Sequence, residues 1–74
     1  MKHYDPEHLR QLLETKVCPK GELFGVDLSK ADLSKAVLYS SDLREAKLSK
    51  ANLAKADLQE ANLVGADLHG ADLN

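Results

Sequence analysis

The chain is 74 residues long and nearly neutral, with ten Lys and Arg against twelve Asp and Glu and a formal net charge of −2 at pH 7. This length makes one domain at most, and the balanced charge indicates ordinary solubility without a strong field of either sign. Two Tyr, one Phe and no Trp are few for the core of so small a globular protein.

The N-terminal segment predicts a helix over residues 5–16. Asp5 is a good N-cap, Pro6 suits the first helical position, and Glu7 favours the positive end of the helix dipole. Tyr4 and Leu9 are spaced for a hydrophobic staple across this start. The helix is expected to end before the turn-forming stretch at residues 18–21.

One side of this helix is apolar. Leu9, Leu12 and Leu13 form the stripe, which Val17 could extend. A coil or solenoid exposes backbone groups and apolar side chains at its open end, so such a stripe is suited to covering that end. We therefore expect residues 1–20 to form a capping helix and turn, followed by a single repeat unit over residues 21–74.

From residue 23 onward, leucine occupies every fifth position without interruption. On an α-helix a step of five residues leaves each leucine about 140° from the last, so no stripe forms. On a straight strand an odd step alternates between the two faces. A chain that turns one corner per repeat gathers all the leucines on the inside: Leu23, Leu28, Leu33, Leu38, Leu43, Leu48, Leu53, Leu58, Leu63, Leu68 and Leu73.

The residue two before each leucine is small in every repeat except at Val26. Along an extended segment it points the same way as the leucine, while the residue between them is polar almost throughout, Val37 being the exception. The two residues after each leucine are mostly Ser, Lys, Gly, Glu, Gln or His, the polar and glycine-containing composition of turns. The predicted inward alanines are Ala31, Ala36, Ala46, Ala51, Ala56, Ala61, Ala66 and Ala71.

The run VDLSK ADLSK AVLYS SDLRE AKLSK ANLAK ADLQE ANLVG ADLHG ADLN resembles the pentapeptide-repeat family, whose units read A(D/N)Lxx. The resemblance implies an all-β solenoid, namely a right-handed quadrilateral β-helix with one pentad on each side. With four sides to a coil, residues 21–74 make about 2.75 coils, which stack at the usual strand spacing. Family members resemble this chain in the short helix and Cys-containing turn before the first coil. Some carry a second Cys where this chain has Gly21.

The pattern runs at full strength to Leu73 with no closing element. We expect Leu58, Leu63, Leu68 and Leu73 to be partly exposed on the last coil. Fully burying a leucine stabilises a protein by about 1.5–3 kcal/mol. Two explanations stay open: two copies meet through this end as a homodimer, or the residues belong to a longer solenoid.

With four pentads per coil, residues twenty apart stack. Lys30 is then expected over Lys50 and Lys35 over Lys55, either as an anion-binding patch or as ordinary surface charge. Asp27, Lys47 and Asp67 should form one column and Asp32, Asn52 and Asp72 another. Phe24 could join Val64 and Tyr39 in a small binding patch, or pack under the capping helix.

No catalytic, cofactor-binding or metal-binding constellation is predicted. His3, His8 and His69 are not spaced as ligand pairs, and Cys18 has no CxxC partner. The aspartates belong to the repeat, so their number says nothing about acid–base chemistry. An interior filled with leucine and alanine leaves no room for a substrate.

These features predict a non-catalytic, rigid scaffold that binds an unknown protein partner through its outer faces, without a cofactor, nucleic acid or membrane. The polar N-terminus and single cysteine favour a cytoplasmic location. The resemblance adds an alternative, because some family members mimic DNA and modulate type II topoisomerases, although lysines on the surface disfavour that role. A fragment of a larger multidomain protein is a third possibility.

Overall fold

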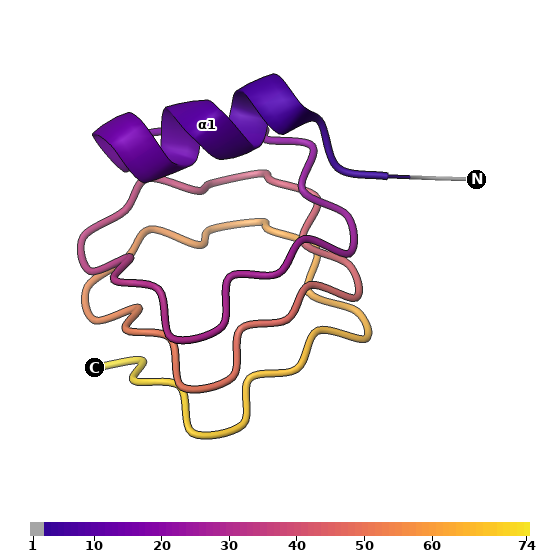
Figure 1. Ribbon diagram of the computed structural model, residues 1–74. Helices are drawn as coiled ribbons and strands as arrows, with labels where there is room; N and C mark the ends of the chain where they lie inside the picture. The colour runs from indigo at the N-terminus through magenta and orange to yellow at the C-terminus, as the bar shows by residue number, and fades with distance from the viewer. Residues whose placement is uncertain (1–2) are drawn as a thin grey trace.

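The computed structural model describes residues 3–74 and contains one helix, α1 (Pro6–Thr15), lying across one end of a coil (Figure 1). The coil has no extended strands. Instead, single residues form parallel bridges to residues twenty positions later, from Val17 with Val37 to Asn52 with Asp72. A bridge spacing of twenty and a sequence period of five together place four pentads in each coil.

Helix α1 begins and ends with capping interactions. Asp5 has an extended backbone (φ −87°, ψ 116°), and its carboxylate accepts a hydrogen bond from the Glu7 N–H at 2.9 Å. Lys16 takes a left-handed conformation (φ 62°) and donates its N–H to the Leu12 carbonyl at 2.8 Å. The helix start that the sequence predicted at Asp5 and Pro6 is confirmed.

Every corner of the coil is a tight turn. From Leu23 to Leu68, the carbonyl of each repeat leucine accepts the N–H of the residue three positions later, as in Leu28 with Ala31 at 3.1 Å. The residue just before that donor has a positive φ, including 64° at Lys30 and 63° at Lys35. Positive φ normally favours glycine, yet among residues 3–74 glycine occupies this position at only three corners, Gly25, Gly65 and Gly70.

Hydrogen bonds in both directions join neighbouring coils. The Leu23 N–H donates to the Asp42 carbonyl at 2.9 Å, and the Asp42 N–H donates back to the Gly21 carbonyl at 2.8 Å. Leu28 and Lys47 repeat this pattern on the next side. Most backbone groups of the middle coil are thus paired without long strands.

The core is a column of inward side chains. The leucines from Leu23 to Leu53 are all buried, together with Val26, Ala36, Ala46 and Ala51. Ala31, Ala56, Ala61, Ala66 and Ala71 are half-buried. Ser41 replaces alanine at one inward position, where its hydroxyl accepts the Gly21 N–H at 3.0 Å and donates to the Cys18 carbonyl at 3.1 Å.

The coil begins one pentad before residue 21, the predicted start. Val17 already bridges to Val37, and Cys18 is buried at 2% exposure in the place that leucine takes in later repeats. The pentads from Lys16 onward therefore number twelve, or about three coils instead of about 2.75. The pattern hid this repeat because Lys16 and Cys18 replace the usual alanine and leucine. Met1 and Lys2 of the predicted N-terminal segment lie outside the described residues.

Helix α1 covers the first coil with two of its three predicted leucines. Leu12 is completely buried, and Leu9 packs against the core. Leu13 is 57% exposed, so its predicted place in the buried stripe is wrong. Leu13 follows Leu12 by one position and therefore lies about 100° around the helix from it.

Burial falls away at the opposite end. Leu58, Leu63 and Leu68 are half-buried, and Leu73 is 57% exposed. Within residues 3–74, the N–H groups of these four leucines have no acceptor, because no further coil lies below them. In the same described range, no helix is both long and apolar enough to cross a membrane.

Candidate interaction surface

Four rows of outward side chains run along the axis of the coil, one on each side. The predicted columns of Asp27, Lys47, Asp67 and of Asp32, Asn52, Asp72 are confirmed by the parallel bridges. The other two rows are Glu22, Asp42, Asn62 and Val17, Val37, Asp57. Because the backbone fixes these rows, their side chains are presented at regular spacing.

The Asp and Asn side chains of these rows stabilise the corners. In each case a side-chain oxygen accepts a hydrogen bond, at 3.0–3.2 Å, from the backbone N–H two residues later, a known turn-forming contact. Sequence reasoning missed this role, although the Asp or Asn in most units signals it. The acceptors are Asp27, Asp32, Asp42, Asn52, Asp57, Asn62, Asp67 and Asp72.

Two of these carboxylates are stabilised in the ionised form. The Ser29 backbone N–H, followed by the Ser29 hydroxyl, lowers the pKa of Asp27. At Asp32 the Ser34 hydroxyl is the larger cause of a lowered pKa, followed by the Ser34 N–H. Carboxylates held in this way accept hydrogen bonds and are poor proton donors at neutral pH.

The predicted lysine stacking is present at two corners. The Lys30 N–H donates to the Ser49 carbonyl at 2.9 Å, and the Lys35 N–H to the Ala54 carbonyl at 2.8 Å, which places Lys50 and Lys55 in the coil below. All four lysines are exposed. None of the four forms an ion pair with an acid among residues 3–74.

Phe24 lies at a corner and stacks on the next coil. The Cζ atom of Arg44 is 5.2 Å from the centre of its ring, within range for a cation–π contact. Asp42 orients the same guanidinium through two hydrogen bonds at 2.8 and 2.9 Å. Val64, one coil further down, is 72% exposed.

One side of the coil is apolar on its outside. Val17 and Val37 are bridge partners at outward positions, and Val17 is 44% exposed. Tyr39, at the corner that follows Val37, is 40% exposed. We call the surface formed by Val17, Val37 and Tyr39 the valine face.

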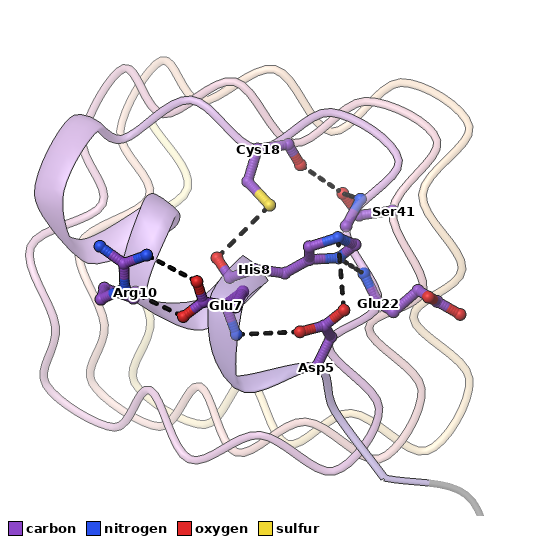
Figure 2. Close-up of polar contacts among 8 residues, drawn as sticks. Asp5, Glu7, His8, Arg10, Cys18, Glu22 and Ser41 are labelled. Carbon is purple, nitrogen blue, oxygen red and sulfur yellow. Dashed lines mark hydrogen bonds and ion pairs between the residues drawn. The ribbon is translucent and has the colours of Figure 1, made fainter.

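Polar groups of α1 and of its N-cap pair with backbone groups of the first coil. The Asp5 N–H donates to the Glu22 carbonyl at 2.8 Å. Figure 2 shows the bond in which the Glu22 N–H donates to His8 Nδ1 at 2.9 Å. Gln11 Nε2 donates to the Val17 carbonyl at 2.7 Å. These contacts complete the cap that the apolar stripe alone predicted.

Asp5, His8 and Glu22 bring three metal-ligand types within 4.8 Å of one another. However, Nδ1 of His8 accepts the Glu22 N–H, so in the neutral ring the proton is on Nε2, which lies 3.6 Å from the Asp5 carboxylate. A nitrogen that carries a proton has no lone pair for a metal. The arrangement therefore fits a structural latch between α1 and the coil better than a metal site.

Cys18, His3 and His69 do not gather into a reactive group. The Cys18 thiol is buried and donates to the His8 carbonyl at 3.5 Å (Figure 2). Burial, with a smaller contribution from the Asp5 carboxylate, raises the pKa of this thiol, which disfavours the reactive thiolate. His3 and His69 are exposed, at opposite ends of the chain.

Comparison with known proteins identifies the repeat. The family model described as pentapeptide repeats (8 copies) matches residues 22–59 and 36–74. No curated protein matches the chain significantly. Since the family model covers well over half of the sequence and its period agrees with the bridges of the coil, the chain belongs to the pentapeptide-repeat family.

Proposed function

We propose that the protein is a rigid, non-catalytic interaction module that binds a protein partner through its outer faces. The observation that carries the proposal is the fixed register of the outward rows, in which side chains twenty residues apart are neighbours. Solenoids commonly present extended binding surfaces of this kind. The right-handed, four-sided β-helix implied by the family and a cytoplasmic location are part of the proposal.

The state of the polar groups supports a binding role over catalysis. The Asp carboxylates of the outward rows accept hydrogen bonds from backbone N–H groups, and the Cys18 thiol is buried. The inward positions are filled by leucine and alanine, and no cavity is found among residues 3–74. Mimicry of DNA is a weaker alternative, because exposed lysines at Lys30, Lys35, Lys50 and Lys55 interrupt the negative charge that such mimicry needs.

Affinity capture from the source cells tests the proposal. The wild-type chain is compared with Leu48→Lys, which places a charge in the core and should abolish the coil. We expect at least one protein to be retained by the wild type and lost with the variant. If both baits retain the same proteins, the interaction does not depend on the folded module, and the proposal is wrong.

The open end of the last coil supports a second proposal, self-association. Leu73 is 57% exposed, and on the same coil the N–H groups of Leu58, Leu63 and Leu68 have no acceptor among residues 3–74. Pairing with a second copy would bury this apolar end and its backbone groups. Leu73→Lys should then convert a dimer to a monomer in light scattering, whereas Val64→Lys, on an outward position of the same coil, should not. A wild-type chain that stays monomeric at high concentration contradicts this proposal.

A further inference from the structure

We propose that the valine face is the docking surface of this module and that it takes an acidic protein segment with apolar side chains. The inference rests on the proposed binding function and names the side of the coil that performs it. It is carried by three observations: the apolar character of this side, the local hydrogen bond that Val37 gives up, and the charge around it.

The first observation is where the apolar side chains lie. On the other three sides of the coil, every outward position is Asp, Asn, Glu or Lys. On this side, the first two coils carry Val17 and Val37, which are adjacent through a parallel bridge, with Tyr39 beside them. Val17 and Tyr39 are 44% and 40% exposed. Apolar groups clustered on a surface that is otherwise polar mark sites of interaction.

The second observation is that the fold itself favours another residue at position 37. An Asp or Asn there could accept the Tyr39 N–H, as eight equivalent side chains do elsewhere. Within residues 3–74, the Tyr39 N–H has no acceptor. Glu22 and Lys47 also lack this corner-stabilising bond, but at Val37 it is replaced by an apolar side chain on the surface. A departure of this kind from local preference is expected at functional positions.

The third observation is the charge that borders the face. Lys20 lies beside Tyr39, to whose carbonyl its N–H donates at 2.8 Å. Lys35 and Lys55 follow the opposite border, one above the other. These three lysines are exposed and form no ion pair with an acid among residues 3–74, whereas Lys16 nearby is paired with Asp32 at 3.4 Å. The acids of this side, Asp57 and Glu60, lie in the last coil.

An apolar strip between unpaired lysines selects a partner of complementary chemistry. Apolar side chains of the partner would cover Val17, Val37 and Tyr39, and its carboxylates would meet Lys20 on one border and Lys35 on the other. Contacts of this kind at an exposed rim accelerate binding and make it sensitive to salt. A surface of three apolar residues fits a transient interaction better than a permanent one.

The test uses a phage-displayed library of random peptides, selected on the full-length protein, with affinities of the selected peptides measured by fluorescence anisotropy. Selected peptides should combine Asp or Glu with apolar residues. Val37→Asn should weaken their binding at least about tenfold, equivalent to about 1.4 kcal/mol. This variant introduces the side chain that the coil accepts at other repeats, so its thermal stability should be retained or raised.

Matched controls separate this face from the rest of the surface. Val64→Asn removes an exposed valine at a different corner and should leave affinity unchanged. Replacing Lys35 and Lys55 with Glu should weaken binding and reduce its dependence on salt. The same change at Lys30 and Lys50, on the neighbouring corner, should have a much smaller effect.

Other occupants would overturn the inference. Selective binding to phosphatidylserine vesicles, without selection of acidic peptides, would assign the lysines to a membrane surface. Loss of a dimer in Val37→Asn would assign the face to a second copy. Peptides whose binding survives Val37→Asn would place docking on another face and leave the proposed function standing. Failure to enrich any peptide over the Leu48→Lys control would count against both proposals.

Discussion

At the scale of single residues, the coil depends on left-handed backbone at its corners. Among residues 3–74, nine residues other than glycine have a positive φ: eight are Lys, Glu or Ser at the corners, and the ninth, Lys16, ends α1. For such residues, this conformation costs about 1–2 kcal/mol relative to the right-handed region. The composition of the turns was evident from the sequence. Which turn residue has the positive φ was not, because Lys and Glu, unlike Gly, do not signal that conformation.

Substitution by glycine at one of these corners should therefore stabilise the protein. We expect Lys50→Gly, at φ 60°, to raise the free energy of unfolding by up to about 1 kcal/mol, the relief of strain being partly offset by the greater entropy of glycine in the unfolded chain. Urea denaturation measures the change. Lys47→Gly, in a bridge without positive φ, is the control and should destabilise; equal effects at both sites would contradict the assigned corner geometry.

Because of the Asp side chains at the corners, we expect the stability of the protein to depend on pH in the acid range. Their folded-state pKa values at Asp27 and Asp32 are lowered, so the ionised forms contribute stability that is present above the unfolded pKa of about 3.9. This contribution should be lost as the pH falls through the lower pKa of the folded state. In urea denaturation at a series of pH values, Asp27→Asn together with Asp32→Asn should give a flatter acid profile than the wild type. An unchanged slope would show that these carboxylates do not titrate with unfolding.

At the scale of elements, α1 closes the first coil through both apolar and polar contacts. The apolar half was predictable from the leucine spacing and the N-cap at Asp5. The polar contacts were not predictable. The hydrogen bonds from Glu22 to His8 and from Gln11 to Val17 join residues whose pairing depends on the docked position of the helix. The hidden first repeat escaped detection for a similar reason, since Cys18 replaces leucine where Leu12 packs nearby in the same core.

The two neighbouring leucines of α1 give a direct test of this docking. Leu12→Ala should destabilise the protein by about 2–5 kcal/mol, as expected for a leucine removed from a fully buried site. Leu13→Ala should change stability by no more than about 0.5 kcal/mol, because its side chain is largely exposed. Thermal unfolding of both variants distinguishes the two positions. Similar losses would mean that the helix is rotated from its described orientation.

At the scale of the whole molecule, stability comes from stacking repeats that do not fold alone. The leucine period predicted the inward column and the corners, and the resemblance to the family added the four-sided coil and therefore the stacking of residues twenty apart. The valine face could not be singled out in the same way, because Val37 was a lone exception until Val17 was found beside it in the hidden repeat. The proposed docking surface therefore depends on the position of the first coil.

The inward column should be much less tolerant of charge than the outward rows. Leu48 is completely buried, and Leu48→Lys should abolish cooperative unfolding as monitored by circular dichroism. Lys47→Gln changes the adjacent outward residue and should shift stability by no more than about 0.5 kcal/mol. Comparable tolerance at both positions is incompatible with the described register.

The bridge interval of twenty residues also governs how such a protein can change length. Loss or gain of a single pentad would turn every later side chain by a quarter of a revolution, carrying lysines and acids onto different sides. Only additions or losses in whole multiples of twenty keep each vertical stripe aligned. A protein that binds its partner through one such stripe should therefore gain or lose whole coils during evolution, because smaller changes in length would move the residues of the stripe to other sides.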